Sequence, residues 1–184
     1  LALLAVLALA TPGAAQMHGH GMGHGHGHGH GADGTGHDEV TMPGLRGLNA
    51  TPEESAEIAV LFRNFRTLRR EVETLPNGIR TTTRSSDPAV MEALVSHVVG
   101  MIARVEARDY PQIFIQSQTL DIFFARGDRI ETEIEITEAG IVVVQTSDDP
   151  ELVAAMQVHA AEVTDMADRG MAAVHEAMMR QAGN

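Results

Sequence analysis

The chain of 184 residues contains no cysteine, no tryptophan and no lysine, and aromatic residues make up only 3% of it. Without cysteine it can form no disulfide, no covalent c-type haem attachment and no lipoprotein anchor. The scarcity of aromatic rings argues against binding carbohydrate or single-stranded nucleic acid by stacking. A formal net charge of −12 also argues against DNA and RNA, because both require a clustered basic surface. We therefore expect no nucleic-acid partner.

Residues 1–10 are wholly apolar and are followed by small residues up to Ala15. The apolar run is too short to cross a bilayer, which takes roughly 20 residues. An apolar segment followed by small residues is typical of a secretory signal peptide, here without its charged start. We interpret residues 1–15 as a signal peptide, and a buried N-terminal helix is the alternative. The protein is then periplasmic or secreted, with no integral membrane span.

Residues 16–48 form a tail and linker that is rich in histidine and glycine up to residue 37. This composition buries too little apolar surface to fold alone, so we expect disorder without a ligand. Neutral imidazoles bind copper, nickel and zinc, and flexible glycines let several imidazoles converge on one ion. An expression tag, or a solvated tail with incidental metal affinity, would have a similar composition. The predicted tail ligands are His18, His20, His24, His26, His28, His30 and His37.

The rest of the chain matches itself at one constant shift of 62 residues. Self-similarity at a fixed period indicates duplicated structure. We divide residues 49–184 into a first copy, 49–110, and a second copy, 111–184. Duplicated units often pack about a pseudo-two-fold axis, where equivalent residues meet. The clearest matches are Gly78 with Gly140, Asp87 with Asp149, Pro88 with Pro150 and His97 with His159.

The residue pattern of each copy predicts a helix, a β-hairpin and a second helix. In the first copy, Thr51 and Glu54 predict a capping box, with the helix running to about Arg70. A Pro-Asn-Gly turn ending at Gly78 joins two strands, and Asp87 caps a helix that reaches about Arg108. The second copy repeats this plan, with helices over about 119–130 and from 150 to about 179. We predict an α+β fold with one four-stranded antiparallel sheet and helices packed on one face.

Both His97 and His159 interrupt the apolar stripe of a helix that should face the core. An unpaired buried polar group costs roughly 1–3 kcal/mol, and a shared metal ion would supply the missing partner. The alternative is an ordinary core histidine hydrogen-bonded to backbone. Met101, Met156 and Met166 lie on the same faces as the two histidines. Thioether with imidazole favours Cu(I), although methionine is also a common core filler.

A further methionine-rich group surrounds His175 near the end of the chain. It is compatible with a surface Cu(I) patch, with an oligomer contact such as a homodimer interface, or with an edge that docks on the sheet. We found no strained nucleophile turn and no glycine-rich phosphate loop, and therefore predict that the protein is not an enzyme.

These observations predict an exported metal-binding protein that binds, buffers or delivers copper, with nickel or zinc as further ions at the tail. Its composition resembles that of His- and Met-rich periplasmic copper-handling proteins. Expected partners are metal ions, a periplasmic metalloprotein or transporter, and a second copy of the chain. One alternative is a b-type haem protein with His97 and His159 as axial ligands. Another is a metal-free duplicated interaction domain with structural histidines.

Overall fold

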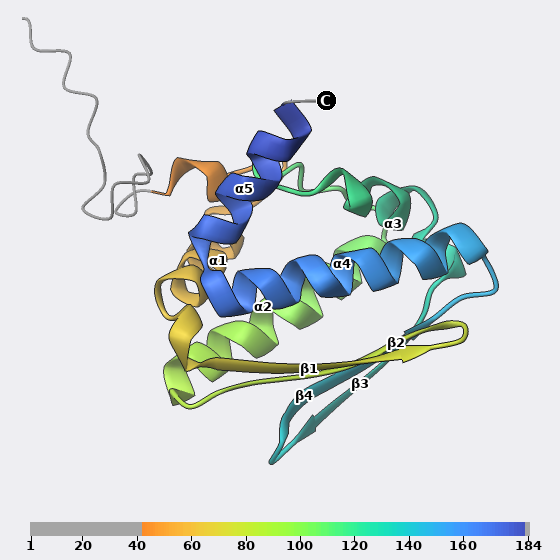
Figure 1. The fold of residues 1–184 in the computed structure, drawn as a ribbon, viewed down its shortest axis with the longest axis horizontal. Coiled ribbons are helices and arrows are strands. Elements are labelled where there is room, and N and C mark those ends of the chain that lie inside the picture. Colours follow the sequence, from red (N-terminus) through yellow and green to blue (C-terminus); the bar gives the residue numbers. More distant parts are fainter. Residues whose placement is uncertain (1–41, 183–184) are drawn as a thin grey trace, which may run out of the picture.

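The computed structural model describes residues 42–182 and is an α+β fold with five α-helices and one four-stranded antiparallel sheet (Figure 1). The predicted fold class and sheet are confirmed. Short 3-10 turns connect several of the elements. The helices and strands are α1 (Pro52–Arg63), β1 (Leu68–Leu75), β2 (Gly78–Ser85), α2 (Pro88–Glu106), α3 (Asp121–Ala125), β3 (Glu131–Thr137), β4 (Gly140–Thr146), α4 (Pro150–Arg169) and α5 (Met171–Ala182).

Side-chain caps fix the starts of α1, α2 and α4. The predicted capping box of α1 is present: Thr51 Oγ1 accepts from the Glu54 N–H at 3.2 Å, and Glu54 Oε2 accepts from the Thr51 N–H at 2.7 Å. Asp87 caps α2 by accepting from the Ala89 N–H at 2.8 Å. Asp149 caps α4 in the same way. Each cap satisfies backbone donors that would otherwise have no partner at the helix start.

The sheet has the strand order β1-β2-β4-β3, so the two hairpins meet along β2 and β4 at its centre. Val72 pairs with Thr81 in the first hairpin. The positions 62 residues later, Ile134 and Val143, pair in the second hairpin. Both hairpins therefore have the same register relative to their turns.

The central strands β2 and β4 form a seam, and each contributes a glycine that the backbone of the other strand approaches very closely. A Cβ at Gly78 would lie 1.9 Å from the carbonyl oxygen of Gln145, and one at Gly140 would lie 2.3 Å from that of Thr83. Only glycine allows the strands to approach this closely.

The hydrophobic core combines residues from both parts of the chain. In one cluster Ile79 and Val105 pack with Phe123, Leu152 and Met156. A second cluster joins residues of β1, α2, β4 and α4. Figure 1 shows α2 and α4 running across the sheet, with α1, α3 and α5 farther from it. Since neither cluster belongs to one half alone, the two halves share one core. Residues of the second cluster are Leu68, Val90, Leu94, Ile141, Val143 and Ala167.

Two of the predicted helices are shorter than expected. α1 ends at Arg63, not near Arg70, and β1 already begins at Leu68. The side chain of Asn64 donates to the Val60 carbonyl at 2.8 Å and so ends the helix with a side-chain bond. The predicted helix over 119–130 is also divided, because only α3 within it is α-helical and 3-10 turns flank it.

The predicted last helix is interrupted at Gly170. α4 ends at Arg169 and α5 begins at Met171. Gly170 has φ 60° and donates its N–H to the Met166 carbonyl at 2.8 Å. A positive φ is unfavourable for residues with a Cβ, so glycine here ends the helix and redirects the chain.

Within the described residues, α2 alone is long and apolar enough to cross a membrane by length and composition, with mean hydropathy 1.4. Its Val90 and Leu94 pack on the sheet, and Arg104 joins it to α1 through Glu54. These contacts describe a helix embedded in a folded domain. The predicted lack of an integral membrane span stays a prediction.

Candidate functional site

His97 lies on α2, where one side of its imidazole is enclosed. The residue is half-buried, but its Nδ1 is inaccessible to solvent and has no hydrogen-bond partner. Burial lowers the pKa of His97, whereas the nearby carboxylates of Glu57 and Glu54 oppose this effect. Glu57 is held beside α2 by Ser96, whose hydroxyl donates to Glu57 Oε1 at 2.5 Å. The environment therefore favours a neutral imidazole, the form that binds metals.

His159 occupies the corresponding position on α4 and contacts a carboxylate that sequence reasoning did not identify. Its Nδ1 lies 3.5 Å from Glu162 Oε2, and its ring meets Phe123 edge-on with centroids 5.6 Å apart. Glu162 Oε1 accepts from the Ser117 hydroxyl at 2.8 Å and from the Thr119 hydroxyl at 3.2 Å. These two hydroxyls orient the carboxylate, so that its other oxygen is directed toward His159.

The surroundings of Glu162 favour its charged carboxylate form. The His159 side chain is the main cause of the lowered pKa of Glu162, burial opposes it, and the Ser117 and Thr119 hydroxyls lower it further. At 3.5 Å this contact is at the long limit for a hydrogen bond, and neither atom has a shorter one. A carboxylate oxygen and an imidazole nitrogen thus lie side by side, both buried and without a partner.

The two predicted histidines are weakly coupled electrostatically: the charge of a protonated His159 is the smallest of the causes that shift the pKa of His97. Buried side-chain atoms without a partner are rare in folded proteins. Among the described residues there are five such atoms, and three of them are His97 Nδ1, His159 Nδ1 and Glu162 Oε2. We call these three residues the histidine-pair cluster.

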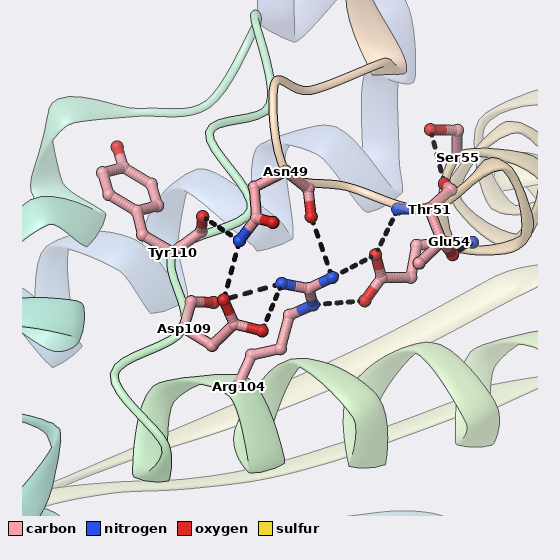
Figure 2. Close-up of polar contacts among 7 residues, drawn as sticks. All are labelled: Asn49, Thr51, Glu54, Ser55, Arg104, Asp109 and Tyr110. Atoms are coloured by element: carbon pink, nitrogen blue, oxygen red, sulfur yellow. Dashed lines mark hydrogen bonds and ion pairs between the residues drawn. The ribbon is translucent and has the colours of Figure 1, made fainter.

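An ion-pair network joins α1 to α2, the helix that carries His97, and is centred on Arg104 (Figure 2). Its guanidinium binds Glu54 through Nε and Nη2, and donates from Nη1 to Asp109 Oδ2 at 2.8 Å. Asn49 joins the network through its carbonyl, which accepts from Arg104 Nη2 at 3.0 Å. Burial favours protonation of Glu54, but hydrogen bonds from Arg104 and from the Thr51 N–H hold its pKa below the ordinary value. Both Glu54 oxygens are thereby occupied, so this network positions α1 against α2.

The predicted methionine ligands occupy different environments. Met156 is fully buried in the core with Ile79, Leu152 and Phe123. Met101 and Met166 are half-buried, one turn after His97 on α2 and two turns after His159 on α4. Packing fully accounts for the position of Met156, whereas Met101 and Met166 have part of their surface free for another contact. A ligand role for any of the three stays a prediction.

His175 is half-buried on α5, separated from α4 by the break at Gly170. The exposed Met178 and Met179 lie on the same short helix. The signal peptide and the seven predicted tail ligands, His18 to His37, lie outside the described residues.

Across residues 42–182, no group of three or more His, Cys, Asp or Glu side chains is arranged closely enough to hold a metal ion. A metal site at the histidine-pair cluster therefore needs a donor of another kind, such as a thioether, or a rotation of Glu162. Because Glu162 Oε2 has no hydrogen bond of its own, that rotation breaks none at this oxygen.

Sequence reasoning found the two histidines but missed Glu162 and Glu57. The available signal for Glu162 was its position three residues after His159, which places both on one helix face. Glu57 had no such signal, because it comes from α1 and approaches His97 only through tertiary packing.

No protein-family model matches the chain, and no curated protein or solved structure is significantly similar to it.

Proposed function

We propose that this protein is an exported metal-binding protein, with copper as its main ion, that binds and buffers or delivers the metal without catalysing a reaction. The observation that carries the proposal is the histidine-pair cluster. Two imidazole nitrogens and one carboxylate oxygen are buried there without hydrogen-bond partners. Leaving such atoms unpaired is unfavourable, and a cation bound at the histidines, with a thioether or a rotated Glu162 as further donor, would supply missing partners.

The donor set indicates which ions suit the cluster. Imidazole with carboxylate suits Cu(II) or Zn(II), whereas addition of a thioether from Met101 or Met166 would favour Cu(I). The acidic residues Glu54 and Glu57 near His97 lower the cost of placing positive charge there. A change of donor between Glu162 and a thioether would let one cluster hold either oxidation state of copper.

We further propose that the two hairpin–helix units are copies of one ancestral unit, with the long helices on the same face of the sheet. The shared hairpin registers and the equivalent contacts of Gly78 and Gly140 support this proposal. Related copies would also account for histidines at equivalent positions of α2 and α4.

In this proposal the histidine-rich tail captures Cu(II), or nickel and zinc, and the folded domain holds copper more selectively. A periplasmic metalloprotein or transporter would receive the metal. Flexible imidazoles exchange ions readily, whereas ligands fixed on two helices select for geometry.

The test uses the full mature chain with all seven tail histidines changed to asparagine. We expect about one copper ion per chain to remain after dialysis, since a fixed site binds more tightly than buffer. His97→Asn and His159→Asn should each abolish this binding. His175→Asn is the matched control, because it removes a half-buried histidine outside the cluster and should leave the copper in place.

Elemental analysis and absorption spectra are recorded on the same samples. Loss of all metal with the tail histidines would show that the paired histidines are structural, as in a metal-free interaction domain. A Soret band that vanishes in His97→Asn would instead identify a b-type haem protein. Retention of copper in both His97→Asn and His159→Asn would exclude the cluster as the site.

A further inference from the structure

The edge of the sheet at β1 carries a groove that is separate from the histidine-pair cluster. The groove has a volume of about 470 Å³ and runs between β1 and one stripe of α4. Val72 and Thr74 line it from the strand, and Gln157, Ala161, Thr164, Asp165 and Asp168 line it from the helix. The Gln157 side chain donates to the Leu75 carbonyl at 3.3 Å and closes the groove beside the hairpin turn.

β1 is an edge strand, since it pairs with β2 alone. Its ladder begins at the Leu75–Gly78 pair beside a two-residue turn. In such a hairpin the pair next to the turn is hydrogen-bonded, and antiparallel residues alternate thereafter. The backbone N–H and C=O groups of Glu73 therefore face β2, whereas those of Val72 and Thr74 face the open edge.

These two residues also direct their side chains to the α4 side of the sheet. Val72 is 39% exposed, although it lies on the sheet face that elsewhere forms the core. A strand added to β1 would pair with the free backbone groups and would place alternate side chains between β1 and α4. The open edge and the groove thus fit one ligand geometry, an extended peptide.

The charge around the groove determines the chemistry of that peptide. Asp165 and Asp168 line its helical wall, whereas on the other face of β1 the exposed Glu71 and Glu73 follow Arg69, and Glu73 lies opposite Arg80 of β2. Arg169 partly neutralises Asp165, at 3.2 Å, while no ion pair forms at the other three carboxylates within residues 42–182. The charged residues that line the groove itself are both acidic, which favours basic side chains in its ligand.

We propose that this groove binds an extended basic segment of a protein partner, which adds to β1 as a fifth strand. Its backbone pairs with Val72 and Thr74, and its inward basic side chains enter the groove beside Ala161 and approach Asp165 and Asp168. This function is distinct from metal binding and assigns a partner class to another side of α4 from His159.

The probe is a fluorescent eight-residue peptide of alternating valine and lysine, matched in length to β1. Its binding to the full mature chain is measured by fluorescence anisotropy. Ala161→Phe should fill the groove and weaken binding at least about ten-fold, or 1.4 kcal/mol. Ala103→Phe is the matched control, because Ala103 is an exposed alanine of α2 far from the groove. Asp168→Asn should weaken binding about three-fold, as expected for one exposed charge contact.

Two further measurements separate strand addition from simple charge attraction. The same peptide with methyl groups on alternate backbone nitrogens keeps its charge but loses one pairing edge, so one of the two methylation patterns should not bind. Amide exchange at Val72 and Thr74 should slow at least about ten-fold with peptide, whereas exchange at Glu73 stays unchanged.

Equal binding by a valine–glutamate peptide, or unchanged exchange at Val72 and Thr74, would overturn the proposal. Equal loss of binding in Ala161→Phe and Ala103→Phe would also do so. Dimerisation of the peptide-free chain that Ala161→Phe abolishes would assign the groove to a second copy instead.

Discussion

Tyr110 is the only tyrosine of the chain, so its titration can be observed without interference. Its hydroxyl donates to Asp121 Oδ1 at 2.6 Å, and its ring stacks on Phe124 with centroids 4.6 Å apart. Burial, followed by the Asp121 hydrogen bond, raises the pKa of Tyr110 to about 12. We predict that the tyrosinate absorbance of the folded protein has its midpoint near this value, and that Asp121→Asn lowers it.

This shift also has a consequence for stability. Because the folded-state pKa of Tyr110 is higher than the unfolded value, the stabilisation is complete below about pH 10 and is lost as pH rises toward 12. A midpoint near 10 in protein that is still folded would contradict the prediction.

His97 gives the opposite dependence on pH. Burial lowers its pKa in the folded state, so the unfolded chain binds the proton more tightly. The free energy of unfolding should therefore be highest above about pH 6.5 and should fall as pH decreases below that value. We predict that His97→Gln reduces this loss, as measured by urea unfolding at neutral and mildly acidic pH. His175→Gln serves as the control, and an equal reduction in both variants would exclude His97 as the cause.

The candidate site shows how much of a binding site can be predicted from residue patterns in the sequence. His97 and His159 were identifiable because each interrupts an apolar stripe and each has the same place in the repeat. Their position relative to each other depends on how α2 and α4 pack, which no local pattern specifies. Glu162 is oriented by the hydroxyls of Ser117 and Thr119, and those residues are more than 40 positions away in the sequence.

At the level of helices and strands, elements with a local chemical signal were predicted well. The Thr51 capping box, the Asp87 and Asp149 caps and both hairpins are present. The errors lie where periodicity continued past the true end of a helix. Phe65 and Leu68 extend the apolar pattern of α1, but the Asn64 side chain ends the helix before them. Tertiary packing then assigns Leu68 to a strand.

Two glycines in helical sequence should respond oppositely to alanine. Gly100 lies within α2, and a Cβ there would meet nothing within 4 Å. Gly100→Ala should therefore stabilise the protein by about 0.5–1 kcal/mol through helix propensity. Gly170 has φ 60°, and a Cβ there would lie 2.8 Å from the Phe65 ring. Gly170→Ala should destabilise by about 1–3 kcal/mol through strain and overpacking.

Thermal and urea unfolding of the two variants measure this difference. Destabilisation by Gly100→Ala would show that α2 requires flexibility or close contact at that position. An unchanged stability of Gly170→Ala would show that the α4–α5 break adapts to a side chain.

For the whole molecule, the shared core predicts a single cooperative unfolding transition. Both hydrophobic clusters contain residues from the two halves, so neither half can lose its packing alone. Far-UV circular dichroism and Tyr110 fluorescence should therefore give the same midpoint in urea. The chain has no tryptophan, so Tyr110 dominates the fluorescence signal. Two separated transitions would show that the halves unfold independently.

Substitutions at the seam between β2 and β4 test whether the two halves depend on each other for stability. Gly78→Ala and Gly140→Ala would each force a Cβ against a carbonyl of the opposite central strand. Each should lower the free energy of unfolding by about 1–3 kcal/mol while the single transition is preserved. A variant that unfolds in two steps would indicate that the seam alone couples the halves.

The pairing of β2 with β4 also determines how the fold depends on protein concentration. Two separate half-chains would have to find each other by diffusion, and dilution would pull them apart. Here one covalent connection links the halves, so their association is intramolecular and has a fixed effective concentration. If the protein is exported as proposed, this tether keeps its interlocked two-part core intact in a dilute compartment with no disulfide.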